Sequence, residues 1–449
     1  MTIPRHASRF LFSCFVLACL ASTPALAAIP IQHWTQPSGA KVYFVASPSI
    51  PMLDVRLEFD AGARREPADK AGLASATASM ASMGLQSVNG EPALDENQLS
   101  EAWADLGASF GAGAGVDRIS FSLRSLTYPD LLGKSVELAA RQIGEPAFPS
   151  DIWQRERNRW SASIREANTR PATVAGHAYF KAVYGSHPYG FEMTEESLQR
   201  ISVQDMRQMY GLIQPCRAKV SIVGAVTRAQ ADALVTKLLS RLPAASRCEP
   251  LPPIAEVSAL TAPQTQNIPF QSAQAHVLIG QPGYKRSDPD HFAIMVGNYT
   301  LGAGSFVSLL TQEVREKRGL SYSVSSRFSP GLHAGAFTIG LQTRPDQASQ
   351  ALQVARDVLT RFVAEGPTAE QLKAAKDNLI GGFPLLIDSN GKLLDNVASI
   401  AWNELPLDYL DTWIEKVQRV SATDIQAAFT RKIQPQRMVT VTVGAALPR

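Results

Sequence analysis

Apolar and polar residues alternate with a period of two in four segments, the pattern typical of strands. These segments are 52–62, 117–126, 335–343 and 437–445. Between the strands, apolar residues recur at helical spacing, as at 349–365 and 407–420. This mixture predicts an α+β fold, in which mostly antiparallel sheets are covered by helices.

A further helix is predicted in AGLASATASMASMGLQS, residues 71–87. Up to Gly84 it contains only Ala, Gly, Ser, Thr, Met and one Leu. No face of this helix carries a charge, and small side chains permit close approach to a sheet. We therefore expect a packing role for it.

Three pairs of segments resemble each other at a spacing of 218 to 220 residues, which indicates a duplicated domain. The pairs are 198–215 with 417–435, 219–225 with 438–445, and 148–158 with 366–378. The Pro-rich stretch 249–266 between them is typical of a linker. We therefore predict one domain at 28–250, a linker at 251–262 and a second domain at 263–449.

The chain has 449 residues, of which 45% are hydrophobic, and a net charge of +3. This length allows two or three domains. Because acidic and basic residues are mixed along the chain, the composition argues against a nucleic-acid binder.

The first 27 residues predict a secretory signal and therefore an exported, periplasmic protein. Arg5 and Arg9 precede an apolar run at 10–21, and the small-residue cleavage pattern follows at Ala25-Leu26-Ala27. A lipoprotein signal at Cys19 is the alternative, although Leu17 suits it poorly. No later segment has the 18 unbroken apolar residues of a membrane span.

Cys216 and Cys248 are the cysteines that remain after the signal. Cys216 precedes a predicted strand and Cys248 follows a predicted helix that returns antiparallel to it. We therefore expect a disulfide in an oxidising compartment, with two free thiols as the alternative. A metal site at this pair is disfavoured because no His or other Cys lies nearby.

Two phrases, YGSHPYG at 184–190 and NYTLGAGSFVSLLTQEVREKRGLSYSV at 298–324, resemble the pitrilysin/insulinase-type zinc metallopeptidases. The resemblance covers the mature chain and implies half of a peptidase clamshell. In active members, the helix that matches residues 71–84 carries an H-x-x-E-H motif. Its two His residues bind zinc, its Glu acts on the bound water, and a third ligand comes from a later helix.

The matching positions in this chain are Ser75, Ala78 and Ser79, and none of these side chains suits its role. The resemblance places the third ligand near Ala162 or Ser163, with Glu156 and Glu166 close by. No two histidines after residue 28 have helical spacing. We therefore expect no metal bound by this chain.

Arg315 and Tyr322 match a family pair that reaches the substrate at the zinc. The resemblance implies that the Tyr hydroxyl stabilises the oxyanion and that the Arg supports the substrate. We expect a helix from Phe306 to Lys317, a break at Gly319 and a strand through Tyr322. Without the family context, Arg315 would indicate a solvated helix face and Tyr322 a half-buried position.

The glycine-rich segment 107–118 lacks G-K-[ST] and precedes a strand, so we reject a nucleotide-binding loop. The resemblance implies a strand edge at Gly111, Ala112 and Gly113 that pairs with an extended peptide. A flexible turn is the alternative.

Four further polar residues receive structural interpretations from the sequence. His187, flanked by Pro188 and Tyr189, is more typical of a structural turn than of a metal ligand. A solvated or cavity-facing role suffices for Asp54, Glu58 and Asp60 on their alternating strand.

The leading hypothesis is a non-catalytic subunit of an exported two-subunit zinc peptidase. A homologous partner with H-x-x-E-H would hold the zinc, and this chain would supply Arg315 and Tyr322 for peptide cleavage. The alternative is a pseudo-peptidase, with a homodimer as one form, that binds peptides or acts as a scaffold without cleaving them. Unrelated enzyme chemistry has little support, because no Ser/His/Asp or Cys/His pattern stands out.

Overall fold

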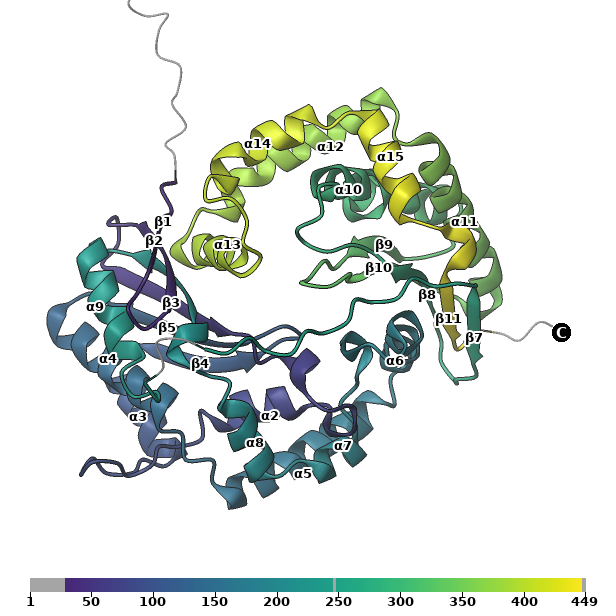
Figure 1. Ribbon diagram of the computed structural model, residues 1–449. Helices are drawn as coiled ribbons and strands as arrows, with labels where there is room; N and C mark the ends of the chain where they lie inside the picture. The colour runs from purple at the N-terminus through teal and green to yellow at the C-terminus, as the bar shows by residue number, and fades with distance from the viewer. Residues whose placement is uncertain (1–28, 245–247, 446–449) are drawn as a thin grey trace, which may run out of the picture.

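The computed structural model describes residues 29–244 and 248–445. The predicted signal at 1–27 therefore lies outside the described residues. The chain forms two α+β halves, each built on one sheet, and the predicted fold class is confirmed (Figure 1). Each of the four segments with period-two alternation contains a strand.

The two sheets repeat one strand pattern. The first has the order β1-β2-β6-β3-β5-β4 and the second has the order β7-β11-β8-β10-β9. In both sheets one parallel pair, β2 with β6 or β7 with β11, is followed by antiparallel pairs out to the edge. The strands are β1 (Gln32–Thr35), β2 (Lys41–Ala46), β3 (Met52–Phe59), β4 (Ser109–Ala114), β5 (Ile119–Leu126), β6 (Lys219–Gly224), β7 (Gln264–Ile268), β8 (Ala275–Pro282), β9 (Ser323–Phe328), β10 (Ala336–Thr343) and β11 (Val439–Val443).

The α-helices of the described residues follow the same duplication, so that α5 and α6 correspond to α12 and α13. In the first half they are α2 (Leu73–Met80), α3 (Glu96–Asp105), α4 (Pro129–Gly144), α5 (Ser150–Ala167), α6 (Pro171–Tyr184), α7 (Glu195–Arg200), α8 (Val203–Tyr210) and α9 (Arg228–Leu238). In the second half they are α10 (His291–Asn298), α11 (Ala348–Glu365), α12 (Ala369–Gly382), α13 (Asn390–Trp402), α14 (Tyr409–Arg419) and α15 (Ala422–Lys432).

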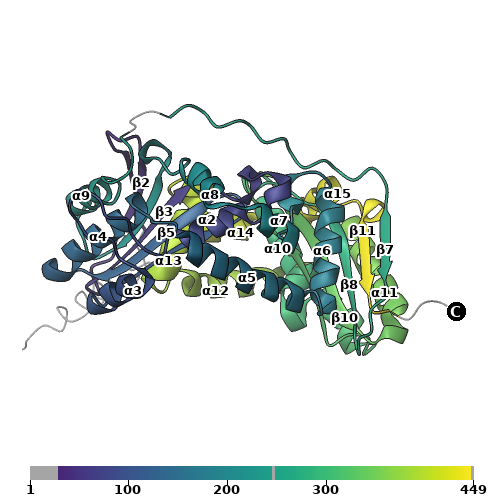
Figure 2. The same ribbon diagram turned by 90° about the horizontal axis from the view of Figure 1, so that it is seen from below.

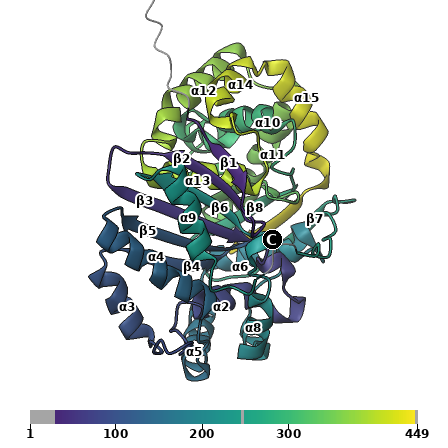
Figure 3. The same ribbon diagram turned by 60° about the vertical axis from the view of Figure 1, so that its left-hand side comes forward.

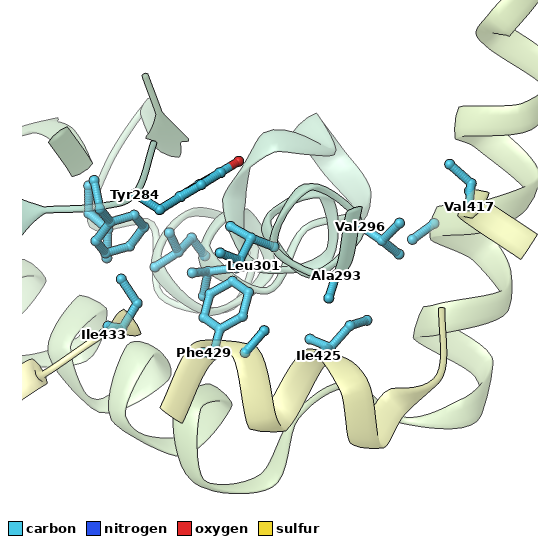
Figure 4. Packing of buried hydrophobic residues seen from close by; sticks show 14 of the residues in the cluster. Tyr284, Ala293, Val296, Leu301, Val417, Ile425, Phe429 and Ile433 are labelled. Atoms are coloured by element: carbon cyan, nitrogen blue, oxygen red, sulfur yellow. The ribbon is translucent and has the colours of Figure 1, made fainter. Parts of the chain in front are cut away.

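Each sheet is covered on one face by helices of its own half. Helices α4 and α9 lie in front of the first sheet in Figure 3. In the second half, α10 and α15 pack closely, since a Cβ on Gly297 would lie 2.6 Å from both Ile425 and Phe429. Figure 4 shows Phe429 of α15 beside Leu301, which follows α10, and Ile425 of α15 beside Ala293 of α10.

The other face of each sheet is covered by a helix from the opposite half. Helix α6 of the first half packs on β8 and β11, and α13 of the second half packs on β3 and β6. Within the α6 contact, the buried Tyr179 hydroxyl donates to the carbonyl oxygen of Phe337 at 2.7 Å. Gly280 leaves room for this ring, because a Cβ there would lie 2.1 Å from the Tyr179 oxygen.

Helix α13 buries charged residues of β3 that we expected to face solvent or a cavity. Asp54 is 5% exposed and Glu58 is 0% exposed, so this expectation is wrong for both residues. The covering helix lies more than 300 residues further along the chain, where strand alternation carries no information about it. Asp60, beyond the end of β3, is partly exposed and accepts from Arg64 Nη2 at 2.7 Å.

The buried Glu58 carboxylate lies 3.0 Å from Arg118 Nε. The Arg118 guanidinium in turn stacks 5.0 Å from the ring centroid of Trp402, at the end of α13. Burial raises the pKa of Glu58 to about 7, although Arg118, Arg56 and Lys219 favour the charged form. The neutral carboxyl is therefore the form that the interface between α13 and the first sheet favours.

This interface predicts a pH-dependent stability. In the unfolded chain Glu58 titrates near 4.5, so the unfolded state releases the proton first as pH rises. The folded state is therefore favoured most below pH 4.5 and loses stability as pH rises toward about 7. Glu58→Gln abolishes this titration. We expect its free energy of unfolding, relative to the unmodified protein, to increase by about 3 kcal/mol across that window.

Denaturant titrations at pH 4.5 and pH 8 measure this change. Glu101→Gln, at an exposed glutamate, is the matched control and should show no such trend. A Glu58→Gln profile parallel to that of the unmodified protein would contradict the buried titration.

The segment that joins the halves is extended and runs along the outside of the molecule (Figure 2). It is held by both halves: the carbonyl oxygen of Ala255 lies 3.0 Å from His187 Nε2, and Glu256 accepts from the backbone N–H of Ala334 at 2.8 Å. Val257 is buried. Near its start, Cys216 and Cys248 are joined by a disulfide with a Cα–Cα distance of 5.8 Å.

Across the described parts of the chain, no helix combines the length and apolar character needed to cross a bilayer.

Candidate functional site

Helix α2 places the degenerate motif positions at a partly exposed surface. It runs from Leu73 to Met80, shorter than the predicted 71–87. Ser75 and Ser79, four residues apart, lie on one partly exposed face, while Ala78 is 1% exposed. The rest of the helix packs into the first core, as its small residues predict.

The buried carboxylate of Glu66 fixes the N-terminus of α2. It accepts from the backbone N–H groups of Gly72 and Ala74, each at 2.8 Å. Burial raises the pKa of Glu66, and these two N–H donors oppose the rise. The Glu66 carboxylate therefore fixes the first turn of α2. The partly exposed face of this helix carries only the hydroxyls of Ser75 and Ser79.

Helix α5 is the element on which the resemblance placed a third zinc ligand. Ala162 and Ser163 are exposed, and so is Glu166, which pairs with Arg170. Glu156 is instead 5% exposed and faces inward, although its carboxylate already accepts from Arg159 Nε at 2.9 Å.

These residues do not fit a zinc ion. The α2 face offers two neutral hydroxyls, and the buried Glu156 carboxylate is neutralised by Arg159 and by Arg155 at 3.3 Å. Nor do the described residues contain any cluster of three His, Cys, Asp or Glu side chains that could hold a metal. We therefore assign no metal-dependent step to this chain.

A cavity of about 540 Å³ lies against Ser75. Trp160 and Ile164 of α5 and Met193 form its apolar walls, and it also contacts Ser163, Ala167, Asn168, His177 and Glu192. His177 Nδ1 lies 2.6 Å from Glu192 Oε1. No sequence signal indicated this pair, since the two residues lie on different elements.

The segment before Arg315 is less helical than expected. The predicted helix from Phe306 to Lys317 begins later and is wider than expected: Ser305–Val307 is a 3₁₀ turn, Leu309 and Leu310 are α-helical, and Thr311–Glu316 forms a π-helix. The chain runs so close to β9 that a Cβ on Gly302 would lie 2.5 Å from Ser326 N. It then turns at Ser305, whose φ is +52°, so a regular helix cannot start at Phe306.

Arg315 lies between two aromatic rings. Its guanidinium carbon is 4.9 Å from the ring centroids of both Phe306 and Tyr322. Its Nε lies 3.3 Å from Glu316 Oε1. Tyr322 directly precedes β9 and is 80% exposed, so its phenol projects into solvent. The half-buried position considered for Tyr322 is therefore wrong, and the contribution of Phe306 was not foreseen from the sequence.

Gly111, Ala112 and Gly113 lie in β4, the edge strand of the first sheet. The flexible-turn alternative is therefore wrong. Ala112 pairs with Phe121 of β5, and the opposite side of β4 faces no strand within the described residues. A Cβ at Gly111 or Gly113 would meet no atom within 4 Å. Both glycines are exposed, so β4 carries no side-chain bulk at these two positions.

His187 is a structural residue, as its turn context suggested. It is 7% exposed, and its Nδ1 accepts from the backbone N–H of Tyr189 at 3.1 Å while Nε2 contacts the linker. Burial, followed by the charge of nearby His333, lowers the pKa of His187. The neutral form of His187 is therefore favoured where its ring contacts the linker between the halves.

The structure brings some of the predicted residues together. Helix α2, with Ser75 and Ser79, packs on β4, which carries Gly111 to Gly113. Arg315 and Tyr322 lie in the second half beside β9, which Figure 1 shows apart from α2. Two surfaces result, one apolar beside α2 and one cationic and aromatic beside β9.

Comparison with known proteins gives a consistent family pattern. Residues 41–195 match the family model described as insulinase (peptidase family M16), and residues 200–379 match the one described as the peptidase M16 inactive domain.

Three known proteins illustrate the similarity. A peptidase M16 inactive domain from Pseudomonas fluorescens is 30% identical with a TM-score of 0.85, over 93% of this chain and 98% of that one. An uncharacterized zinc protease of Streptomyces coelicolor is 34% identical over 159 residues, so this chain spans about a third of that relative's length (34%). The periplasmic protease PqqL from Escherichia coli, 18% identical with a TM-score of 0.78, shares the fold over 93% of this chain and 46% of its own.

Proposed function

Because this chain belongs to peptidase family M16, we propose that it is the non-catalytic subunit of an exported zinc peptidase. The second subunit would be a homologous chain with an intact H-x-x-E-H motif. The substrate would be an unstructured peptide enclosed between the two subunits.

One contrast carries this proposal. The positions that match the metal motif hold Ser75, Ala78 and Ser79. Arg315 and Tyr322 instead match the family pair in spacing, with the Arg315 side chain 31% exposed and Tyr322 80% exposed. An exposed tyrosine beside a stacked arginine is difficult to explain as packing, because the Tyr322 ring buries little surface. It suits a group that acts on a substrate held by another chain.

The two side chains would have separate tasks. The Tyr322 hydroxyl would donate a hydrogen bond to the scissile carbonyl oxygen as negative charge develops there. Arg315, held by its aromatic neighbours, would bind the substrate backbone or a carboxylate with little loss of side-chain entropy. Zinc, held by the partner, would supply the activated water.

Size and the N-terminal sequence support the remaining parts of the proposal. The chain covers less than half of PqqL, so a second chain of similar size would complete an assembly of that length. The basic, apolar and A-x-A order of residues 1–27 supports export.

Co-expression tests the proposed function. This chain and an H-x-x-E-H homologue from the same organism are purified alone and together, then incubated with an unstructured peptide. We expect cleavage only by the pair, and zinc, measured by atomic absorption, only in the homologue. Stoichiometric zinc and proteolysis in this chain alone would refute the proposal, and peptide binding without turnover in the pair would favour a pseudo-peptidase.

A further inference from the structure

A second cavity, of about 670 Å³, lies between the two halves. The first half contributes the turn at 115–118, between β4 and β5, and the C-terminal end of α6. The second half contributes residues 329–331, which follow β9, and the C-terminal end of α13. Small-molecule sites often lie between domains and have volumes in this range. The proposed peptidase role assigns no task to this cavity.

Aromatic rings form much of the cavity wall, which includes Phe180, Tyr184, Tyr189 and Trp402. The two tyrosine hydroxyls already have partners inside the protein. Tyr189 donates to Asp117 at 2.7 Å, and Tyr184 accepts from the first backbone N–H of β10 at 2.8 Å. The tyrosines therefore offer apolar ring surface more than free hydroxyls, and such a wall suits a planar aromatic group.

Arg286 gives the cavity a positive charge. Its Nη2 donates to the neutral hydroxyl of Tyr409 at 2.7 Å, and its guanidinium stacks on the ring of that residue. Asp288, two residues further along the chain, pairs with Lys432 instead. Within the described residues, Arg286 therefore has no carboxylate partner.

Arg118 is the second cation that lines the cavity. Its Nε lies 3.0 Å from Glu58, but burial favours the neutral form of that carboxyl, which then balances the Arg118 charge only in part. Arg118 Nη1 and Trp402 Nε1 are buried donors for which the described residues provide no acceptor. Because unsatisfied buried donors are costly, an acceptor that reaches them would stabilise the site.

Asp117 is the acidic residue among those that line the cavity, and its carboxylate is already neutralised. It accepts from the Tyr189 hydroxyl and from the backbone N–H of Leu332 at 3.2 Å, and Arg64 Nε lies 3.2 Å from it. Its charge nevertheless opposes a multiply charged anion. A single carboxylate fits better than a phosphate, and its planar shape matches a guanidinium.

We propose that this cavity binds a small aromatic carboxylate, whose negative charge is balanced by Arg286 and Arg118 and whose ring packs against the aromatic wall. The site goes beyond the proposed function and does not depend on it. A ligand there would contact both halves of the chain at once, so its binding would stabilise their packing.

Calorimetric titration of the purified chain tests this site with three probes. They are 2-naphthylacetate, its neutral amide 2-naphthylacetamide, and acetate, which lacks the ring. We expect 2-naphthylacetate to bind with a Kd below about 1 mM, and the other two probes to bind at least about tenfold more weakly. Only 2-naphthylacetate should raise the Tm of the chain, because it binds the folded state.

Two pairs of variants locate the binding. Arg286→Gln removes the charge and should weaken 2-naphthylacetate binding at least about tenfold, whereas Arg344→Gln, at an exposed arginine that does not line the cavity, should not. Ser329→Trp adds an indole at the rim and should weaken binding severalfold. Ser325→Trp, at an exposed position of β9 outside the cavity, is its control. Both serines are exposed, so these two variants should fold.

Three results would overturn the site: no binding of 2-naphthylacetate up to about 10 mM, equal affinity for the acid and its amide, or unchanged affinity in both Arg286→Gln and Ser329→Trp. Tighter binding of 2-naphthyl phosphate than of 2-naphthylacetate would refute the choice of a carboxylate. No partner subunit and no proteolysis enter these measurements, so their failure is distinguishable from failure of the proposed function.

Discussion

Replacing Tyr322 by phenylalanine is expected to lower kcat of the proposed two-subunit peptidase by about 10²- to 10³-fold. This is the loss usually seen when one donor to a developing oxyanion is removed. The substitution keeps the ring that stacks on Arg315, and Tyr322 is 80% exposed, so folding and assembly should not change. Initial-rate kinetics with a fluorogenic peptide, together with size-exclusion chromatography of the pair, measure both properties.

Arg315→Ala should act differently, because the guanidinium is proposed to bind substrate. We expect KM to rise roughly tenfold or more, with a smaller effect on kcat. Two controls match these changes: Tyr128→Phe removes a hydroxyl from another exposed tyrosine, and Arg318→Ala removes an exposed arginine that pairs with Glu313. Full activity in Tyr322→Phe and Arg315→Ala would remove both residues from the reaction.

Gly280→Ala is expected to destabilise the protein by about 2–4 kcal/mol. The added Cβ would lie 1.9 Å from the carbonyl oxygen of Phe337 and 2.1 Å from the Tyr179 hydroxyl. Either β8 or α6 must move, which adds the cost of overpacking to the loss of a buried hydrogen bond. Thermal and denaturant unfolding of the two proteins measure the difference.

Gly340→Ala is the matched control in the neighbouring strand. Its Cβ would approach only the end of the Leu278 side chain, at 3.3 Å, which can shift. We expect its free energy of unfolding to change by less than about 1 kcal/mol. If Gly280→Ala were equally mild, the contact between α6 and the second sheet would not be as close as described.

The sequence was sufficient for most of the strands and for the repeated strand pattern, because both depend on local pattern. Alternation at 52–62 and 335–343 predicted β3 and β10, and the repeated strands at 219–225 and 438–445 occupy the same place in the two sheets. The sequence also located Ser75 and Ser79 on one face of a helix, since four-residue spacing fixes that geometry.

What could not be predicted depends on contacts between distant segments. Glu58 alternates like a solvent-facing residue, yet α13 covers it from the other half of the chain. The stacking of Phe306 on Arg315 and the pairing of His177 with Glu192 require the chain path around them. Only backbone geometry, such as the positive φ of Ser305, reveals why the helix that carries Arg315 begins later than predicted.

The exchange of α6 and α13 between the two halves bears on the origin of the duplicated fold. These helices are equivalent members of the two repeats, and each covers the sheet of the other repeat. A single repeat made as a separate polypeptide would leave one sheet face bare and one helix without a surface to cover. Two copies that exchange this helix would satisfy both needs, so a helix-exchanged dimer of single repeats is the simplest origin for this arrangement.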